Sequence, residues 1–350
     1  MLNWNPPADT VNAGSMLMDA DELAGMIRDI RKDIGHGDAD IRIVDVVLDE
    51  KRDSLLIVAP DRSDKSAIIG KGGWVAGRLR EKLGVGRVHV EAETDIIIRR
   101  HRVGLALERI SELEGSFRVL KILEEALKMR MEYPSGLEFL LELSRSGADG
   151  PEVAVALSGG VDSSFSLIAA VKLGLRPFAL TVDPGTIILP GHIRRSLEEL
   201  CSLLGVRHEY IGAELGDIQS GALDGRFHPC GRCSGLIEST VMDKIRNMEI
   251  DTVIFGDLLS TGYQSVNVDD GILRVNLPAL FAASKQEVRS VASLHGVRSS
   301  MNFGCPLLGE VHRRHPHLRR YSIQRVLRET RAGVLEPGEA LDLIWSICSP

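Results

Sequence analysis

The chain has 350 residues, of which 44% are hydrophobic and 26% are charged, values that are ordinary for a folded globular protein. They exclude a collagen-like, low-complexity or disordered chain, and no apolar run approaches the roughly 20 residues that a bilayer-spanning helix needs. The five cysteines do not indicate a disulfide scaffold. Since residues 1–10 also lack the basic and apolar parts of a signal peptide, we expect a cytoplasmic protein with no membrane partner.

The net charge of −7 is unevenly distributed along the chain. Residues 1–50 hold 11 acidic and 4 basic residues, so acidic and basic residues balance in the other 300. Residues 312–331 contain seven arginines and one acidic residue. This basic stretch is either a solvated helix face or a contact with nucleic acid phosphates. The second interpretation gives the RNA-binding candidates Arg313, Arg314, Arg319 and Arg320.

Residues 1–17 are expected to form an N-terminal tail, and residues 18–100 a first domain of the α+β type. Apolar residues at helical or alternating spacing predict the elements of this domain. In order, these are a helix at 20–34, strands at 41–49 and 54–60, a short helix ending at Ile69, a glycine loop, a helix at about 74–83 and a strand at 87–93.

A helical connector over 101–149 leads to a second domain over 150–310, in which strands and helices alternate. The predicted strands cover 153–157, 178–182, 208–213 and 252–256, and predicted helices cover 163–173 and 192–205. Such alternation predicts an α/β fold with a parallel sheet and right-handed crossovers. The remaining residues, 311–350, are expected to form a basic helical segment.

A glycine-rich string joins the first strand of the second domain to its first helix: Ser158-Gly159-Gly160-Val161-Asp162-Ser163-Ser164. Free N–H groups and the positive dipole end at a helix N-terminus suit phosphate oxygens, and glycines let the backbone approach an anion closely. The plainer alternative is a strand-to-helix turn with a serine cap. The string lacks the lysine of a Walker loop.

This SGGxDS string resembles the PP-loop of the N-type ATP pyrophosphatases, which cleave ATP between the α and β phosphates. The resemblance covers about 150–310 and implies a Rossmann-like domain that binds ATP and Mg²⁺. It implies catalytic roles for Asp162 and Ser163. It also implies that the nucleotide is bound by Ser158, Gly159, Gly160, Asp162, Ser163, Ser164, Asp183 after the second strand, and Asp257 after the fourth.

Three cysteines stand out by position: Cys230 and Cys233 form a C-x-x-C pair, and Cys305 precedes Pro306. A bare C-x-x-C pair is compatible with zinc, a redox dithiol or iron–sulfur ligation. For zinc, His228 or His312 could supply a fourth ligand. Of the other two cysteines, Cys201 lies on the apolar side of a helix and is expected in the core, and Cys348 is given no role.

A PP-loop followed by C-x-x-C and a later C-P resembles the iron–sulfur tRNA thiolases, which make 2-thiouridine or 2-thiocytidine. The resemblance implies that Cys230, Cys233 and Cys305 hold a 4Fe-4S cluster, with one iron open to sulfide. It also implies a catalytic role for Cys305. Zinc and a direct cysteine persulfide relay are the alternatives.

The chain departs from the thiolases in two places. Residues 234–240, which follow the C-x-x-C pair, contain no Lys or Arg, although the thiolases usually carry one there. The string after the fourth strand reads Gly256-Asp257-Leu258-Leu259 instead of the Gly-His-x-x-Asp-Asp of the thiolases. These departures leave the modified base and the acceptor class open.

The glycine loop of the first domain, Gly70-Lys71-Gly72-Gly73, resembles the G-x-x-G loop of a type II KH domain, which clamps single-stranded nucleic acid. The resemblance makes these four residues RNA-binding candidates, together with Arg78 in the helix that follows. The alternative is an inert KH-like module used for dimerisation.

Together the two domains predict an ATP-dependent RNA sulfurtransferase that acts on tRNA or another structured RNA. Its sulfur would come from sulfide or a sulfur-carrier protein, and a homodimer is left open. One rival hypothesis is a PP-loop ligase that forms an amide or amine and has a structural zinc site. The other is an RNA-binding regulator that senses ATP.

Overall fold

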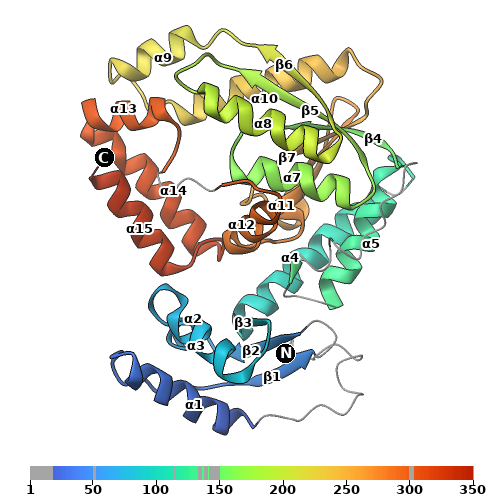
Figure 1. Cartoon of the computed structure of the whole chain (residues 1–350). Helices are drawn as coiled ribbons and strands as arrows, with labels where there is room; N and C mark the ends of the chain where they lie inside the picture. The colour runs from blue at the N-terminus through green and yellow to red at the C-terminus, as the bar shows by residue number, and fades with distance from the viewer. Residues whose placement is uncertain are drawn as a thin grey trace. The chain divides into compact units, whose positions relative to one another are not determined.

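The computed structural model describes residues 19–49, 53–113, 115–132, 136–137, 141, 150–298 and 303–349. These residues form two compact units, shown in Figure 1. The first unit contains residues 19–101 together with 130–132, and the second contains 102–129 together with the residues that follow 135.

The first unit has the predicted order of elements. Helix α1 (Ala20–Asp33) precedes strands β1 (Asp45–Asp49) and β2 (Ser54–Ala59). Helix α2 (Arg62–Ile69), the short turn η3 (Lys71–Gly73), helix α3 (Trp74–Leu83) and strand β3 (Arg87–Ala92) follow. Strand β1 begins four residues later than predicted, and helix α4 (Glu93–Glu112) begins directly after β3, where the sequence predicted that the connector would start only at 101.

The three strands form a mixed sheet in the order β1-β2-β3, with β1 antiparallel and β3 parallel to β2. Helices α1, α2 and α3 pack their apolar positions on one side of this sheet. The core that they form contains Leu23, Ile27, Ile30, Leu55, Ile57, Ile68, Val75 and Leu79, all buried. Alternation along β2 sends the neighbouring Val58 to the opposite face, where it packs against Ile96 of α4.

The second unit is built on a six-stranded sheet, which confirms the predicted α/β fold. Its strands are β4 (Glu152–Ala156), β5 (Arg176–Asp183), β6 (Arg207–Gly212), β7 (Thr252–Phe255), β8 (Val266–Asp269) and β9 (Ile272–Asn276). They lie in the order β6-β5-β4-β7-β9-β8, and all neighbours are parallel except β8 and β9. The hairpin of β8 and β9 was not predicted, because β8 has only four residues and two of them are polar.

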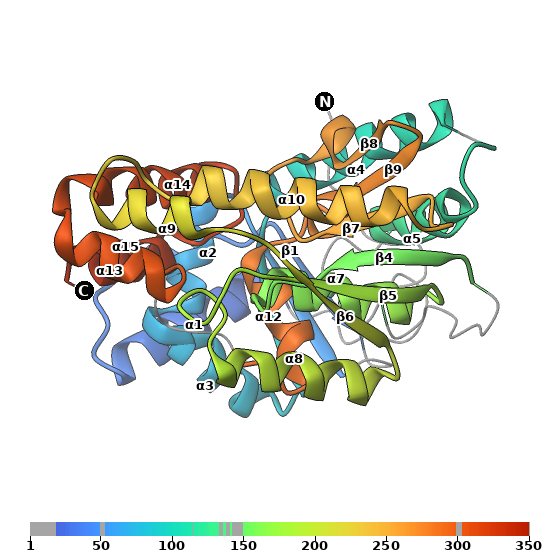
Figure 2. The same cartoon turned by 90° about the horizontal axis from the view of Figure 1, so that it is seen from above.

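Helices cover both faces of this sheet (Figure 2). Helix α10 (Cys230–Arg246) lies on one face and packs Val241, Met242 and Ile245 against buried residues of β4, β5 and β7. Helices α7 (Val161–Lys172), α8 (Gly191–Leu204) and α12 (Lys285–Leu294) lie on the other face. The shorter elements of this region are α9 (Gly216–Leu223), η4 (Gly262–Ser265) and α11 (Leu277–Leu280).

The C-terminal segment is helical, as predicted. It contains α13 (Pro306–Arg314), the turn η5 (Pro316–Leu318), α14 (Arg319–Arg331) and α15 (Pro337–Cys348). Helices α14 and α15 pack around Val326, Leu335, Ala340 and Ile347. Helix α5 (Val119–Glu132) follows α4 in the connector, and Arg102 of α4 donates a hydrogen bond of 2.7 Å to the carbonyl of Ala332. None of the helices in the described residues is long and apolar enough to cross a membrane.

Candidate active site

The strand order in the sheet of the second unit reverses at β4, because β5 and β6 are added on one side of it and β7 on the other. This strand pairs in parallel with β5 on one side and with β7 on the other. In open α/β sheets ligands bind at such a switch point, outside the carboxyl ends of the strands. The carboxyl end of β4 leads into residues 158–164, here called the SGG loop, and Asp183 and Asp257 lie at or just after the ends of β5 and β7. The fold therefore brings the predicted nucleotide-binding residues to one edge of the sheet.

The SGG loop is shaped by close approach of the surrounding backbone and side chains. Gly159 has a φ of +83°, and a Cβ atom there would lie 2.4 Å from Cγ2 of Ile193. Ser163 is buried, and its hydroxyl donates to the carbonyl of Gly160 at 3.0 Å and accepts from the N–H of Ser158 at 3.1 Å. Gly256 permits equally close packing, because a Cβ there would lie 2.8 Å from the backbone nitrogen of Ser163. The Ser163 hydroxyl thus holds the loop in shape.

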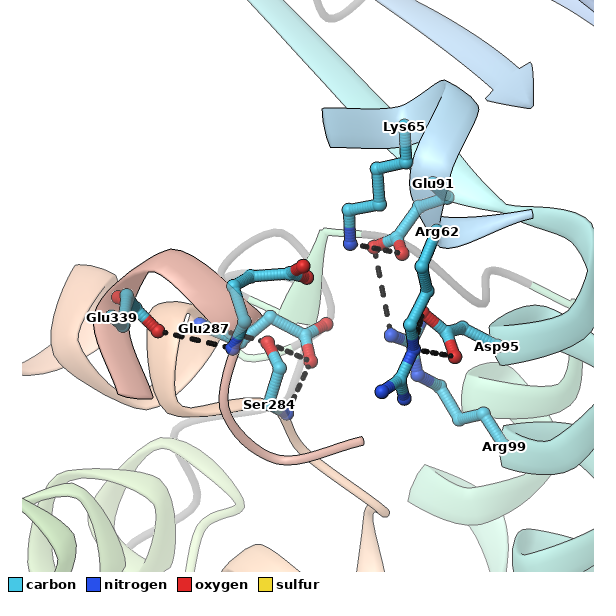
Figure 3. Close-up of polar contacts among 9 residues, drawn as sticks. Arg62, Lys65, Glu91, Asp95, Arg99, Ser284, Glu287 and Glu339 are labelled. Atoms are coloured by element: carbon cyan, nitrogen blue, oxygen red, sulfur yellow. Dashed lines mark hydrogen bonds and ion pairs between the residues drawn. The ribbon is translucent and has the colours of Figure 1, made fainter. Parts of the chain in front are cut away.

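Asp162 forms an ion pair with Lys285, a residue that the sequence did not indicate as part of the site. Nζ of Lys285 lies 2.6 Å from both carboxylate oxygens of Asp162, and both side chains are mostly buried. Lys285 is the first residue of α12, whose start is fixed by a capping box between Ser284 and Glu287 (Figure 3). The S-x-x-E signature of this box was visible in the sequence and could have located the start of the helix. Its contact with Asp162, 123 positions earlier, could not be found from sequence spacing.

The two other predicted nucleotide-site carboxylates are already engaged. Asp183 forms an ion pair with Arg194 of α8 and accepts a hydrogen bond from the N–H of Gly185 at 3.1 Å. The hydrogen bond from Arg194 holds the pKa of Asp183 below its usual value. Asp257 accepts hydrogen bonds from the N–H of Leu259 at 3.1 Å and from Ser260, so it closes its own turn. Both residues shape the edge of the site.

Cys230, Cys233 and Cys305, here called the cysteine triad, converge from two helix starts. Cys230 is the first residue of α10, Cys233 lies one turn later, and Cys305 caps α13. Burial, and then repulsion from Cys305, raises the pKa of Cys230 to about 11, against the opposing charge of Arg325. Burial, and then repulsion from Cys305, also raises the pKa of Cys233. The three thiols are therefore close enough to influence one another electrostatically.

The residues around the triad include the two histidines that the sequence offered as zinc ligands. Within the described residues, no three His, Cys, Asp or Glu side chains are grouped closely enough to hold one metal ion. The two histidines proposed as zinc ligands both bond to the hydroxyl of Ser322, His228 at 3.1 Å and His312 at 3.0 Å.

Arg325 lies on α14, and its side chain is half exposed. Its Nε donates to Oε1 of Glu329 at 2.9 Å, and its guanidinium lies 5.9 Å from the centre of the Phe303 ring. Burial lowers the pKa of Arg325, but the negative charge of Glu329, then of Cys230 and Asp162, raises it above its usual value. Ser322, one turn earlier on the same helix face, bonds to His228 beside the C-x-x-C pair. Arg325 was counted in the basic stretch, but its place in this site was missed because its partners are distant in the sequence.

The arginines predicted to bind RNA differ in their surroundings. Arg313 and Arg314 are exposed and both bond to Glu310, at 2.7 and 2.6 Å. Hydrogen bonds from Arg313, and then from Arg314, lower the pKa of Glu310 to about 2. Arg319 donates to the carbonyls of His312 and Cys348, so it ties three helices together. Arg320 donates to the hydroxyl of Tyr321 at 2.8 Å.

In the first unit, residues 70–73, here called the GKGG loop, join α2 to α3. Gly70, Gly72 and Gly73 have φ values of +72°, +63° and +75°, a region that favours glycine. A Cβ at Gly70 would also lie 2.2 Å from Cγ2 of the buried Val75. Lys71 is exposed. Arg78 is also exposed and pairs with Glu81 at 3.1 Å.

The first unit also contains a network of charged side chains (Figure 3). Glu91 accepts from two buried cations: Lys65 at 3.4 Å and Arg99 at 3.5 Å. Arg62 pairs with Asp95 at 2.9 Å. These pairs join α2 to β3 and to the start of α4, so they fix the helix that leads into the GKGG loop.

Comparisons with known proteins place the chain in a family. No protein-family model matches the sequence. The Methanocaldococcus jannaschii protein named "Uncharacterized protein MJ1638" is 31% identical over 260 residues, which are 74% of this chain and 96% of that protein. The chain belongs to the MJ1638 family.

Two further proteins are similar over shorter or more divergent regions. The 7-cyano-7-deazaguanine synthase of Psychromonas ingrahamii is 28% identical over 162 residues, which are 42% of this chain and 69% of that enzyme. The solved structure of the U34-tRNA thiolase NcsA from Methanococcus maripaludis, with its 4Fe-4S cluster, matches with 15% identity and a TM-score of 0.34. That match covers 56% of this chain and 76% of the thiolase chain.

Proposed function

We propose that this protein is an ATP-dependent RNA sulfurtransferase of the PP-loop ATP pyrophosphatase type, and that tRNA is its substrate. The observation that carries the proposal is that one unit contains both the SGG loop, whose Asp162 pairs with Lys285 at the carboxyl end of β4, and the cysteine triad at the starts of α10 and α13. This arrangement supports an enzyme that activates a carbonyl with ATP and then replaces its oxygen with sulfur.

ATP would bind at the carboxyl end of β4, with its phosphates against the SGG loop and the start of α7. Without nucleotide, Lys285 and Asp162 neutralise each other. An incoming triphosphate would compete with Asp162 for the ammonium of Lys285, since phosphate oxygens are strong acceptors for a compact cation. Mg²⁺ bound through Asp162 would neutralise charge on the departing pyrophosphate.

The chemistry has two balanced steps. The carbonyl oxygen of the target base attacks the α-phosphorus of ATP, and pyrophosphate leaves. A sulfur nucleophile then attacks the activated carbon, and AMP leaves with the former carbonyl oxygen. A 4Fe-4S cluster held by Cys230, Cys233 and Cys305 would supply the binding place for sulfide. Arg325, whose guanidinium is held by Glu329, would stabilise negative charge on the leaving AMP.

The first unit would hold the RNA. Its element order and its mixed sheet support a type II KH-like domain, in which the GKGG loop lies against the sugar-phosphate backbone. Lys71 would neutralise a phosphate there. The exposed Arg313 and Arg314 of α13 would add phosphate contacts from the second unit.

The decisive experiment uses the full chain, prepared and assayed without air, with tRNA, sulfide and magnesium ATP. We expect AMP and pyrophosphate as products, and a thionucleoside in the tRNA by mass spectrometry. Asp162→Ala should abolish both. Cys305→Ala should abolish the thionucleoside but preserve pyrophosphate release, whereas the exposed Cys348→Ala should behave as wild type. Formation of ADP and phosphate instead of AMP and pyrophosphate would contradict the PP-loop assignment.

Arg325 gives a more specific test of the shared site. Arg325→Gln should slow thionucleoside formation by about 100-fold, the usual effect of removing one preorganised charge-stabilising group. Arg325→Lys should retain part of the activity. Arg328→Gln, an exposed arginine on the same helix, provides the matched control. Equal rates in the Arg325 and Arg328 variants would remove Arg325 from the reaction.

A second candidate is a PP-loop ligase that installs nitrogen instead of sulfur. The similarity to 7-cyano-7-deazaguanine synthase favours it. The same assay with ammonia in place of sulfide distinguishes the two, because only the ligase would form a nitrogen-containing product. The ATP-sensing regulator predicts RNA binding with no AMP formed in either assay.

A further inference from the structure

Trp74 is a large apolar side chain that the core of the first unit does not use. It is the first residue of α3, and its side chain is 63% exposed, whereas the next residue, Val75, is fully buried. Leu79, further along the helix, is also buried. Helix α3 therefore packs through Val75 and Leu79 and presents Trp74 to solvent at the GKGG loop.

The GKGG loop holds the indole in a defined place. A Cβ atom on Gly72 would lie 3.3 Å from Cδ1 and 3.6 Å from Nε1 of Trp74, so this edge of the indole lies over the loop backbone. Gly72 and Gly73 both have left-handed φ values. The rest of the exposed indole surface is available to a ligand. The loop thus positions a flat apolar ring beside backbone that lacks side chains.

The charge around Trp74 indicates which kind of ligand would cover it. Arg78, four residues later, lies on the same face of α3, and both are exposed. Lys71 is exposed three positions before Trp74, the first residue of the helix, and within the described residues it makes no ion pair. A flat apolar ring flanked by cations complements a single nucleic acid strand, which alternates anionic phosphates with flat bases.

We propose that Trp74 stacks on an unpaired base of the RNA strand whose backbone lies along the GKGG loop. The inference rests on the proposed RNA-binding function of this unit and adds a base-contacting residue to it. Lys71 and the loop backbone would hold the phosphate, and Trp74 would hold the base. Stacking accepts every base but is stronger for purines, so the site would favour an unpaired purine.

The test uses the full chain and two single-stranded RNA octamers, oligoadenylate and oligouridylate. Their affinities are measured by fluorescence anisotropy of end-labelled RNA at one salt concentration. Trp74→Ala should weaken oligoadenylate binding by about 5- to 150-fold, the range of base–aromatic stacking. Trp74→Phe should stay within a few-fold of wild type. Trp345→Ala is the matched control, because Trp345 on α15 is also 63% exposed.

A second readout follows the indole itself. In a chain carrying Trp4→Phe and Trp345→Phe, Trp74 is the remaining tryptophan, and its emission should be quenched as RNA is added. The quenching should saturate at the same concentration as the anisotropy. An octamer with an abasic sugar at each second position should bind more weakly and quench less.

The outcomes separate this inference from the proposed function. If Lys71→Ala weakens binding while Trp74→Ala leaves it unchanged, the loop holds RNA without a stacked base and the inference is wrong. If neither change affects RNA binding, RNA binding by the first unit is wrong as well. If Trp74→Ala converts a dimer to a monomer in sedimentation with unchanged RNA affinity, Trp74 contacts a second copy of the chain instead of a base.

Discussion

The two glycine loops of this protein use the same residue type for opposite purposes. In the SGG loop, glycine allows neighbouring groups to approach: Ile193 lies against Gly159, and the Ser163 hydroxyl bonds back to the loop. Its carboxylate, Asp162, is paired with Lys285. In the GKGG loop, Gly70 also permits close packing, against Val75, but Gly72 and Gly73 remove side chains from a surface where Lys71 and Trp74 remain exposed.

This difference shows how the surroundings of a loop decide what it can bind. A loop that is packed against its neighbours, with its polar groups already placed, suits a small ligand whose bonds must be made or broken at a fixed point. An open loop with a cation and an aromatic ring suits a single nucleic acid strand, which is bound through its phosphates and bases and has no reacting atom to hold in place. Substitutions in the SGG loop should therefore lower the turnover rate, and substitutions in the GKGG loop should lower RNA affinity.

The largest expected effect comes from Lys285. Lys285→Ala removes the cation that faces Asp162 and should lower the rate of pyrophosphate release about 100- to 1,000-fold. RNA affinity should stay unchanged. Arg289→Ala is the matched control, because Arg289 lies one turn later on α12 and forms its own ion pair of 2.6 Å, with Glu339. A loss of RNA affinity in Lys285→Ala, with turnover intact, would reverse the roles assigned to the two loops.

Site residues could be predicted from the sequence where the residues that act together are close along the chain. The SGG loop and the GKGG loop are local strings, and each was placed correctly before a helix. The C-x-x-C pair is also a local string, but the sequence analysis did not predict that it begins helix α10. The order of elements in the first unit follows from apolar periodicity. Lys285 was missed because the fold brings it to Asp162 from 123 positions away along the sequence.

The second prediction compares one glycine from each loop. Gly159→Ala combines a strained φ with a Cβ placed 2.4 Å from Ile193, so it should destabilise the second unit by about 2–5 kcal/mol. Gly73→Ala carries only the strain of its φ, because a Cβ there would meet no described atom within 4 Å. Its cost should be about 1–2 kcal/mol. Urea unfolding of both variants measures the difference. Equal losses of unfolding free energy would contradict the contrast between a packed and an open loop.

The third prediction concerns the charge of the open loop. Lys71→Ala should reduce RNA affinity and lower the slope of log affinity against log salt by about one, since one fewer phosphate is neutralised. Stability should not change, because Lys71 is exposed. Lys32→Ala, an exposed lysine at the end of α1, provides the control in the same unit. An unchanged salt slope in Lys71→Ala would show that no phosphate is bound at this lysine.

The smallest expected effect concerns Glu310, which binds Arg313 and Arg314. It tests whether this binding keeps the two arginines from contacting RNA. Hydrogen bonds from Arg313 and Arg314 lower the pKa of Glu310 from 4.5 to about 2. A carboxylate with a lowered pKa in the folded state adds stability above its unfolded pKa, and this stability is lost as pH falls through the folded value. The contribution should therefore be complete above about pH 4.5 and disappear near pH 2. It should be slight because the pairs are exposed and are screened by salt.

Glu310→Gln should accordingly lower the urea midpoint slightly at pH 7 and by less at pH 3. The same change releases Arg313 and Arg314 from their shared partner, so RNA affinity should rise or stay level at pH 7. A fall in RNA affinity would mean that Glu310 orients the two arginines toward the RNA. In that case the second unit would bind RNA through a preorganised cluster of Glu310, Arg313 and Arg314. RNA binding would then not be confined to the GKGG loop of the first unit.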